Sequence, residues 1–275
     1  MHTREEKIAA FGRLLDIMDA LREHCPWNAE QTMESIRPMT EEEVYELSDA
    51  ILKGSSSETA KEIGDLLYHM VFYARIAQEE GDFDIADCIE KICAKMIFRH
   101  PHVFRPDGSI LPEGEAPSAK EIADTWELVK AKEKGGNKTV LGGIPDSMPA
   151  LLKALSMQEK ARGCGFDWEA PSQVWDKVKE EFEEAREAVV EFEVEPDERS
   201  RAHRQEEFGD LLFAVINAAR LHGVDPEAAL SGTCDKFRRR FGYLESQTLK
   251  KGVRLTDLTL AQMDAIWDEA KAKGM

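Results

Sequence analysis

The sequence predicts an all-α protein built from two tandem helical units, and three observations lead to this prediction. Apolar residues recur at steps of three and four along most of the 275 residues, as expected for amphipathic helices. Long runs of alternating apolar and polar residues bounded by hairpin turns, which would indicate strands, are missing from the sequence. Several motifs of the first half recur in the same order in the second half.

The helical pattern falls into separate stretches whose limits are marked by capping and breaking residues. Stripes of apolar residues cover 8–21, 44–52, 63–76, 85–97, 122–129, 174–192, 208–221 and 263–267. Thr40 followed by Glu43 is typical of a capping box and predicts the start of a helix. Gly54 and the three serines after it are expected to end one helix before the next begins. With four prolines and two glycines, residues 100–117 are expected to form a loop.

Residues 134–149 separate the two halves of the chain. They contain four glycines and two prolines between helical patterns, which is a composition typical of a linker. We therefore expect an N-terminal helical unit over residues 1–133 and a C-terminal helical unit over residues 150–275. A chain of this length is long enough for two domains of modest size.

The two halves are interpreted as copies of one helical unit. An offset of 141 positions relates Trp27 to Trp168, Lys95 to Lys236, Arg99 to Arg240 and Trp126 to Trp267. The segment Glu-Ile-Gly-Asp-Leu-Leu at 62–67 matches Glu-Phe-Gly-Asp-Leu-Leu at 207–212 with an offset of 145. The pattern Glu-Glu-x-x-Glu occurs at 42–46 and at 180–184, with an offset of 138. Such small changes of offset indicate equivalent helices joined by loops of different length.

Each copy contains two groups of acidic residues at helical spacing. They are Glu180, Glu181, Glu184, Glu207 and Asp210 in the second copy, and Glu42, Glu43, Glu46, Glu62 and Asp65 in the first. Carboxylates three or four residues apart project from one side of a helix, so two antiparallel neighbouring helices would bring four of them together. Because like charges repel, a hard cation would stabilise such a group. Oxygen ligands favour Mg²⁺, or Mn²⁺, over zinc.

A solvated acidic helix face is the alternative for these residues, because 54 of the 275 residues are Asp or Glu. Three features favour a metal site instead. Asp210 lies among apolar residues such as Phe208 and Leu212, which predicts a place near a core. Gly209 before it, matched by Gly64 in the first copy, would allow close helix approach or access to the backbone. The whole arrangement also occurs twice.

A lysine and an arginine four residues apart follow the acidic groups in each copy. They are Lys236 and Arg240 in the second copy, and Lys95 and Arg99 in the first. Beside a metal site, two cations on one helical face would hold phosphate oxygens that the metal does not reach. An ordinary basic helix end is the alternative. Trp267 and Trp126 are compatible with stacking on a base and equally with core packing.

The charge and the signal patterns exclude several classes of protein. With 54 acidic and 36 basic residues the net charge is −18, which argues against binding to polymeric nucleic acid. The charged start of the chain lacks a signal-peptide pattern and no apolar run is long enough to span a membrane, so we expect a cytoplasmic protein. Walker A, Gly-x-Gly-x-x-Gly and Glu-x-x-His motifs are absent from the sequence, which removes P-loop, dinucleotide-binding and di-iron readings.

The cysteines and the paired histidines are interpreted as structural residues. The five cysteines are odd in number and lack Cys-x-x-Cys spacing, which favours buried thiols over a disulfide or zinc framework. His100 and His102 have no equivalent in the second copy, so we interpret them as loop residues rather than metal ligands.

At these residues the sequence resembles the MazG family of nucleoside triphosphate pyrophosphohydrolases, along essentially the full chain. The resemblance lies in both acidic groups and in the segments at 25–27 (Cys-Pro-Trp), 31–32 (Gln-Thr), 99–104 (Arg-His-Pro-His-Val-Phe) and 165–168 (Gly-Phe-Asp-Trp). It implies an all-α fold of tandem four-helix-type units that assembles as a homodimer. It also implies Mg²⁺-dependent, house-cleaning hydrolysis of NTPs or dNTPs to the monophosphate and pyrophosphate.

The resemblance further implies roles for single residues. The metal ligands would be Glu181, Glu184, Glu207 and Asp210, with Glu43, Glu46, Glu62 and Asp65 as their equivalents in the first copy. Lys236, Arg240 and Trp267 would contact the nucleotide. The lysine that the family places before the second Glu-x-x-Asp falls near His203 and Arg204 here, which leaves Arg204 as the candidate for that contact. The C-terminal unit is the active one in the best-known type of this family, but both acidic groups are intact in this chain.

The resulting hypothesis is an in-line attack of water at the α-phosphorus of a metal-bound triphosphate. Glu180 would orient or deprotonate the water, and Lys236 with Arg240 would neutralise the β and γ phosphates, which leave as pyrophosphate. Two alternatives stay open at this point. One is a pyrophosphohydrolase of narrower substrate range, acting on dUTP or phosphoribosyl-ATP. The other is a non-catalytic regulator that senses nucleotides or binds a partner.

Overall fold

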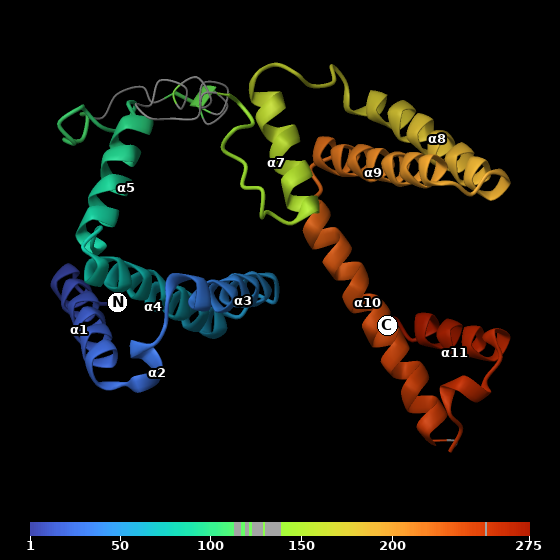
Figure 1. Cartoon of the computed structure of the whole chain (residues 1–275), viewed down its shortest axis with the longest axis horizontal. Coiled ribbons are helices and arrows are strands. Elements are labelled where there is room, and N and C mark those ends of the chain that lie inside the picture. Colours follow the sequence, from blue (N-terminus) through green and yellow to red (C-terminus); the bar gives the residue numbers. More distant parts are fainter. Residues whose placement is uncertain (113–116, 119–120, 123–128, 130–138, 251) are drawn as a thin grey trace. The chain divides into compact units, whose positions relative to one another are not determined.

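The computed structural model describes residues 1–112, 117–118, 121–122, 129, 139–250 and 252–275, which form helices joined by turns and loops (Figure 1). No β-strand occurs in these ranges, where an isolated bridge pairs Phe104 with Ile110 inside the loop predicted after residue 100. The all-α prediction is confirmed. The chain divides into two compact units, Met1–Ala116 (unit 1) and Pro117–Met275 (unit 2).

The predicted linker is described only in part. Residues 139–149 contain no helix, and residues 134–138 lie outside the described ranges. The contacts divide the chain before Pro117, whereas the glycine-rich composition places the first unit's end at residue 133. The predicted helix over 122–129 and Trp126 also lie almost entirely outside the described residues. The boundaries drawn from composition therefore stay a prediction.

Unit 1 is a helical hairpin with further helices packed on it. Its helices are α1 (Arg4–His24), α2 (Pro26–Ala29), α3 (Met33–Leu52), α4 (Ser56–Glu80) and α5 (Ile85–Arg99). As predicted, Gly54, with a positive φ of 69°, and Ser55, whose hydroxyl accepts from the Glu58 N–H, separate α3 from α4. α1 packs on α4, and the core consists of Met18, Ile36, Val71, Phe72 and Ile76.

The start of α3 differs from the prediction. The helix begins at Met33, because Thr32 and Ser35 exchange side-chain hydrogen bonds with each other's backbone N–H groups at 3.3 and 2.9 Å. The capping box predicted at Thr40 and Glu43 is therefore wrong. With the first N–H groups already satisfied, the helix runs through Thr40, whose hydroxyl bonds to side chains of α4.

Unit 2 contains a second hairpin. Its elements are α7 (Ala150–Gly163), η1 (Pro171–Gln173), α8 (Val174–Val194), α9 (Glu198–Leu221), α10 (Pro226–Lys250), η2 (Leu255–Asp257) and α11 (Leu260–Ala272). α8 and α9 pair across residues 195–197, α7 packs on α9, and α10 packs mainly on α11. Its buried apolar residues are mostly small: Ala154, Val174, Ala185, Ala188, Ala214, Ala218, Leu244 and Ala270. Small residues let helices approach closely but bury little apolar volume.

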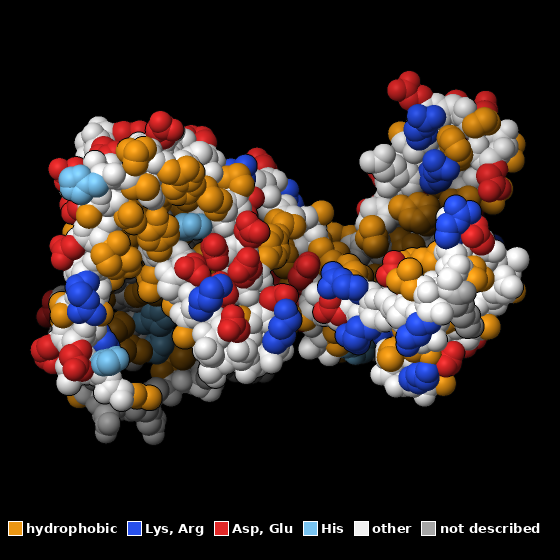
Figure 2. Space-filling model, turned by 90° about the horizontal axis from the view of Figure 1, so that it is seen from below, with side chains coloured by type: hydrophobic (Ala, Val, Ile, Leu, Met, Phe, Trp, Pro, Cys, Tyr) orange, Lys and Arg blue, Asp and Glu red, His pale blue; other side chains and the backbone are white. Residues whose placement is uncertain are grey.

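Large apolar side chains stay at the surface, and Figure 2 shows them gathered into groups on the face in view. On the α8–α9 hairpin, Phe182, Phe208 and Leu212 are 52, 47 and 62% exposed. The prediction that Asp210 lies near a core is therefore wrong, because Asp210 and these neighbours are exposed in the single chain. A Cβ at Gly209 would meet no atom within 4 Å, so this glycine does not mark a close helix approach.

The cysteines are free, but the interpretation as buried thiols is wrong. Cys93, Cys164 and Cys234 are exposed, while Cys25 and Cys88 are half-buried. Cys88 and Cys93 lie on α5, which has no buried residue, and Cys164 follows the last turn of α7. None of the helices within the described ranges has the length and apolarity to cross a membrane.

Candidate functional site

Three carboxylates converge on the α8–α9 hairpin of unit 2. Glu181 and Glu184 lie on α8 and Glu207 lies on α9. One oxygen from each lies within 4.8 Å of the other two, and we call these residues the unit 2 cluster. The helical spacing of the sequence predicted this meeting, because residues 181 and 184 project from one side of α8 toward α9.

The electrostatics of the unit 2 cluster suit a cation. Partial removal from water, followed by the nearby Glu181 carboxylate, raises the pKa of Glu184. Oε2 of Glu181 is buried and has no hydrogen-bond partner. A buried carboxylate oxygen without a partner is costly, and a bound cation would satisfy it. The donor atoms are all oxygens, which fits Mg²⁺ or Mn²⁺.

Lys177 is a site residue that the sequence analysis missed. It lies on α8 one turn before Glu181, and its Nζ is 2.7 Å from Glu181 Oε1 and 2.8 Å from Glu180 Oε1. The hydrogen bonds to Glu180 and Glu181 raise its pKa, so the lysine stays charged. A lysine three and four residues before two glutamates is a visible sequence signal, although it is also common on solvated helices.

Unit 1 contains an equivalent group, the unit 1 cluster. Oxygens of Glu43 on α3 and of Glu62 and Asp65 on α4 lie within 4.8 Å of one another. Removal from water, followed by Asp65, raises the pKa of Glu43. Oε2 of Glu43 and Oε2 of Glu62 are buried without hydrogen-bond partners, and Lys61 Nζ is 2.9 Å from Glu62 Oε1. Glu46, predicted as a fourth ligand, is exposed and lies outside this group.

A cavity of about 720 Å³ opens beside the unit 2 cluster. Glu181, Lys177 and Asp210 belong to its wall. Asp210 thus lies at the cavity rather than within the group of three converging carboxylates. Apolar surface from Trp168 and Phe213 lines another part of the wall. The cavity therefore joins a charged group to an apolar space.

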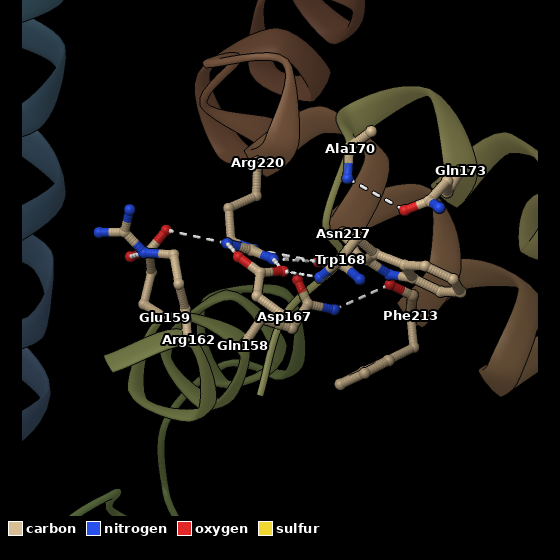
Figure 3. A network of polar contacts seen from close by, with 10 residues as sticks. All are labelled: Gln158, Glu159, Arg162, Asp167, Trp168, Ala170, Gln173, Phe213, Asn217 and Arg220. Atoms are coloured by element: carbon tan, nitrogen blue, oxygen red, sulfur yellow. Dashed lines mark hydrogen bonds and ion pairs between the residues drawn. The ribbon is translucent and has the colours of Figure 1, made fainter. Parts of the chain in front are cut away.

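A polar network lies in the wall formed by α7, α9 and the segment 165–168 (Figure 3). The buried guanidinium of Arg220 donates to both carboxylate oxygens of Asp167, at 3.0 and 2.5 Å. It also donates to Oδ1 of Asn217. The hydrogen bond from Arg220 lowers the pKa of Asp167. Gln158 Nε2 donates to the Phe213 carbonyl oxygen at 2.9 Å. Of these residues only Asp167, in the segment 165–168, belongs to a motif that the sequence presents.

Unit 1 has larger side chains at the positions that align with the cavity wall of unit 2. The offset of 145 that relates 62–67 to 207–212 aligns large residues of α4 with small residues of α9: Phe72 with Asn217, His69 with Ala214, and Tyr73 with Ala218. Phe72 and His69 are buried, at 1 and 7% exposure. His69 Nδ1 and the Tyr73 hydroxyl lie 3.1 and 2.7 Å from the Thr40 hydroxyl. Smaller residues of α9 thus stand at positions in the cavity wall of unit 2, such as Ala214 and Asn217.

Three residues predicted to contact the nucleotide have no described contact with the unit 2 cluster: Lys236, Arg240 and Trp267. Lys236 and Arg240 lie one turn apart on α10. Arg240 donates to the Met275 carbonyl oxygen at 2.7 Å, and Trp267 packs against Phe237 with ring centroids 5.1 Å apart. Their role therefore stays a prediction. In unit 1, Glu42 is exposed on α3, and Lys95 and Arg99 lie one turn apart on α5.

His203 and Arg204 lie near the position where the resemblance places a lysine. His203 contacts the unit 2 cluster, whereas the described contact of Arg204 is with another residue. His203 Nε2 lies 3.2 Å from Glu207 Oε1, and its Nδ1 lies 2.7 Å from Glu191 Oε2. The hydrogen bond to Glu191 is the main cause of the raised pKa of His203. Arg204 instead lies over the Phe192 ring, 3.8 Å from its centroid.

Outside both clusters, His100 Nδ1 lies 2.7 Å from the Met96 carbonyl oxygen, in keeping with a structural role.

Comparison with known proteins identifies the family. A model of the MazG nucleotide pyrophosphohydrolase domain matches the chain twice, over residues 31–104 and 170–243, and these segments contain both clusters. The chain is 40% identical to the nucleoside triphosphate pyrophosphohydrolase of Escherichia coli (strain K12), over 94% of this chain and 96% of that protein. It is 41% identical to the nucleoside triphosphate pyrophosphohydrolase/pyrophosphatase MazG of Thermotoga maritima, over 95% of each. It is also 39% identical to the uncharacterized protein YabN of Bacillus subtilis, over 98% of this chain and 53% of that protein. The chain belongs to the MazG nucleotide pyrophosphohydrolase family and contains its domain in two tandem copies.

Proposed function

We propose that this protein hydrolyses nucleoside triphosphates, with ribose or deoxyribose, to the nucleoside monophosphate and pyrophosphate, and that unit 2 performs the reaction. One observation carries the proposal: Glu181 belongs both to the unit 2 cluster and to the wall of the 720 Å³ cavity. A carboxylate cluster suits a metal-bound triphosphate, and an adjoining cavity of this size suits the nucleoside. The names of the relatives in Escherichia coli and Thermotoga maritima support the reaction class.

We assign the unit 2 cluster to Mg²⁺, with Mn²⁺ as a second ion that suits the same ligands. Glu181, Glu184 and Glu207 would hold the ion, and we assign Asp210, which follows Glu207 by one turn of α9 and lines the cavity, as a further ligand. The partnerless Oε2 of Glu181 supports this assignment. When bound, such an ion neutralises phosphate charge and lowers the pKa of a coordinated water.

The chain's own residues would bind the phosphates and position the water. Lys177 contacts Glu181 of the unit 2 cluster and also lines the cavity, so its Nζ is placed to donate to a phosphate oxygen. Glu180 is exposed and held by Lys177, and it is our candidate to orient the attacking water or to accept its proton. Positioning and charge would supply most of the acceleration, because phosphoryl transfer needs little covalent help.

We propose that unit 1 binds a metal ion without accepting a nucleoside. Its carboxylates Glu43 and Glu62 have partnerless buried oxygens like that of Glu181. However, the positions aligned with Asn217 and Ala214 of the cavity wall hold the larger buried side chains of Phe72 and His69, which would leave no room for a nucleoside. Hydrolysis would then depend on unit 2 alone.

We also propose that the protein is a homodimer. The α8–α9 hairpin leaves Phe182, Phe208 and Leu212 exposed, and a second copy would cover them. Lys236 and Arg240 stay our candidates for phosphate contacts within the dimer, because α10 packs mainly on α11 and leaves both residues only half-buried. The activity would serve to clear unwanted nucleotides from the nucleotide pool.

The test is pyrophosphate release by the full chain over a panel of nucleotides, with Mg²⁺ or with EDTA. The panel contains canonical NTPs and dNTPs, deaminated nucleotides, dUTP and phosphoribosyl-ATP. The proposal expects release from several triphosphates with Mg²⁺ and none with EDTA. Release from dUTP or phosphoribosyl-ATP alone would identify the narrower enzyme. No release from any member would overturn the proposal in favour of a nucleotide-sensing regulator.

A further inference from the structure

One polar group in the cavity of unit 2 has no part in the proposed chemistry at the phosphates. Gln158 on α7 is 6% exposed, and its Nε2 donates to the Phe213 carbonyl oxygen, a contact drawn in Figure 3. Its other amide atom, Oε1, is buried without a hydrogen-bond partner, and Gln158 lines the cavity. An unpaired buried carbonyl is costly, so a ligand that donates to it gains affinity.

Arg220, Asp167 and Asn217, which share the cavity wall with Gln158, bond to one another. Arg220 directs its guanidinium to Asp167 and Asn217, and Asn217 Oδ1 accepts from it. Among the described residues, two of the partnerless buried side-chain oxygens belong to residues of this cavity wall: Glu181 Oε2 and Gln158 Oε1. The first belongs to the proposed metal site. The second is neutral and fits a different part of the ligand.

The position of Gln158 separates it from the phosphates. It bonds to Phe213, which lies six residues beyond Glu207 on α9, a rise of about 9 Å along the helix. A carbonyl oxygen repels phosphate oxygens but accepts from N–H groups. In a nucleotide the ribose adjoins the α-phosphate, so the base reaches farthest from the cluster. Trp168 and Phe213 provide apolar surface in the same wall, which suits a flat base.

We infer that Gln158 Oε1 accepts a hydrogen bond from an N–H group on the edge of the nucleobase, so that the wall of α7 and α9 is the base subsite. This inference rests on the proposed function and extends it to substrate recognition. The bond to the Phe213 carbonyl fixes the amide before a nucleotide binds. Bases that present an N–H donor would therefore bind more tightly than bases of the same shape that present none.

The experiment measures binding of three purine nucleoside monophosphates to the full chain by calorimetry, with Mg²⁺. AMP has a 6-amino group and IMP has an N1–H, whereas purine riboside monophosphate has the same ring without an N–H on that edge. Each is titrated into the wild type and into Gln158→Met, which keeps the length of the side chain without its polar atoms. Gln78→Met, at an exposed position of α4, is the matched control.

For the wild type we expect purine riboside monophosphate to bind about tenfold more weakly than AMP or IMP, because one buried hydrogen bond is lost. Gln158→Met should weaken AMP and IMP by about the same factor and leave purine riboside monophosphate unchanged, so that the two losses do not add. Equal affinities of the three ligands for the wild type would overturn the inference, even if Gln158→Met failed to fold. So would an equal loss for all three ligands in Gln158→Met.

Pyrophosphate release from ATP, measured on the same wild-type preparation, separates this inference from the proposed function. Release without the difference between ligands rejects the base subsite and keeps the hydrolase. The difference without release keeps the base subsite and rejects the hydrolase.

Discussion

Lys177 Nζ lies 2.7 Å from Oε1 of Glu181, while the other carboxylate oxygen of Glu181 is buried without a hydrogen-bond partner. Glu181 thus pairs one carboxylate oxygen with the Lys177 ammonium, and its other oxygen is available to a second cation. This arrangement suggests that Lys177 and a metal ion share Glu181 and that both face the phosphates of the substrate.

The first prediction concerns Lys177. Lys177→Met should raise the KM for a nucleoside triphosphate roughly tenfold or more, because a charge-assisted bond to phosphate is lost. The Mg²⁺ concentration that gives half-maximal turnover should not increase, since the change removes a positive charge beside Glu181. Steady-state kinetics of pyrophosphate release over a Mg²⁺ series measure both. Lys179→Met, an exposed change on the same helix, is the control, and an unchanged KM in Lys177→Met would contradict the assignment.

The second prediction concerns the metal ligands. Mg²⁺ should raise the melting temperature of the wild type by several degrees, because it binds the folded state. Glu184→Gln should lose most of this increase. In EDTA the variant should melt at the same temperature as the wild type or slightly above it. Partial removal from water and then the neighbouring Glu181 carboxylate raise the pKa of Glu184, so a neutral side chain relieves both costs. Calorimetry with Mg²⁺ and with EDTA measures this. If Mg²⁺ stabilises the variant as much as the wild type, Glu184 is not a ligand.

The third prediction concerns the cavity. Ala214→His places in unit 2 the side chain that unit 1 has at the aligned position, His69. The larger side chain should occupy the cavity and lower kcat/KM for nucleotides at least about tenfold. Stabilisation by Mg²⁺ should persist, because the cluster is untouched. Ala202→His, on the exposed side of the same helix, should keep wild-type kinetics. Wild-type kinetics in Ala214→His would show that the nucleoside binds elsewhere.

The fourth prediction concerns acid stability. The hydrogen bond from Arg220 lowers the pKa of Asp167, so this pair stabilises the folded state above the unfolded pKa of about 3.9 and less so as the pH falls below it. Asp167→Asn should lower the melting temperature by roughly 3 °C at pH 7, allowing for partial screening by solvent in the cavity. The difference from the wild type should shrink as the pH falls from about 5 to 3. A difference that is constant over this range would show that the ion pair contributes no pH dependence.

The fifth prediction concerns assembly. Light scattering should find twice the chain mass of 31.0 kDa. Leu212→Glu places a charge on the apolar surface of α9 and should shift the protein toward the monomer, whereas Val194→Glu at the exposed end of α8 should not. A monomeric wild type would contradict the proposed homodimer, because no second copy would then cover the exposed residues of the α8–α9 hairpin.

Periodicity and repetition predicted much of this molecule. The helix class, the separation of α3 from α4 at Gly54, and the meeting of Glu181, Glu184 and Glu207 follow from local spacing, which a helical hairpin converts directly into proximity. The cap of α3 was predicted at Thr40, eight residues after Thr32, because a glutamate was expected as the partner residue, whereas Thr32 pairs with Ser35. Local patterns of this kind give helix type better than helix ends.

The cavity was not predictable in the same way. Its wall combines Gln158 and Asp167 with Asn217, which lies much farther along the chain. Asp167 belongs to the segment 165–168 that carries the family resemblance, but Gln158 and Asn217 stand in none of the motifs. A signal existed in the comparison of the two copies, where Phe72, His69 and Tyr73 align with smaller residues. The size difference can be related to a cavity only when the packing of the helices is known. The exposure of Asp210 was missed because apolar neighbours indicate a covered surface without saying whether the same chain covers it.

The most direct test of the central claim is pyrophosphate release from nucleoside triphosphates with Mg²⁺ by the full chain and by two double variants. One is Glu184→Gln with Asp210→Asn in unit 2, and the other is Glu43→Gln with Glu62→Gln in unit 1. Loss of release in the first variant, with near wild-type release in the second, is the predicted result. Full release from a chain that contains all four substitutions would contradict the assignment of the reaction to these carboxylates.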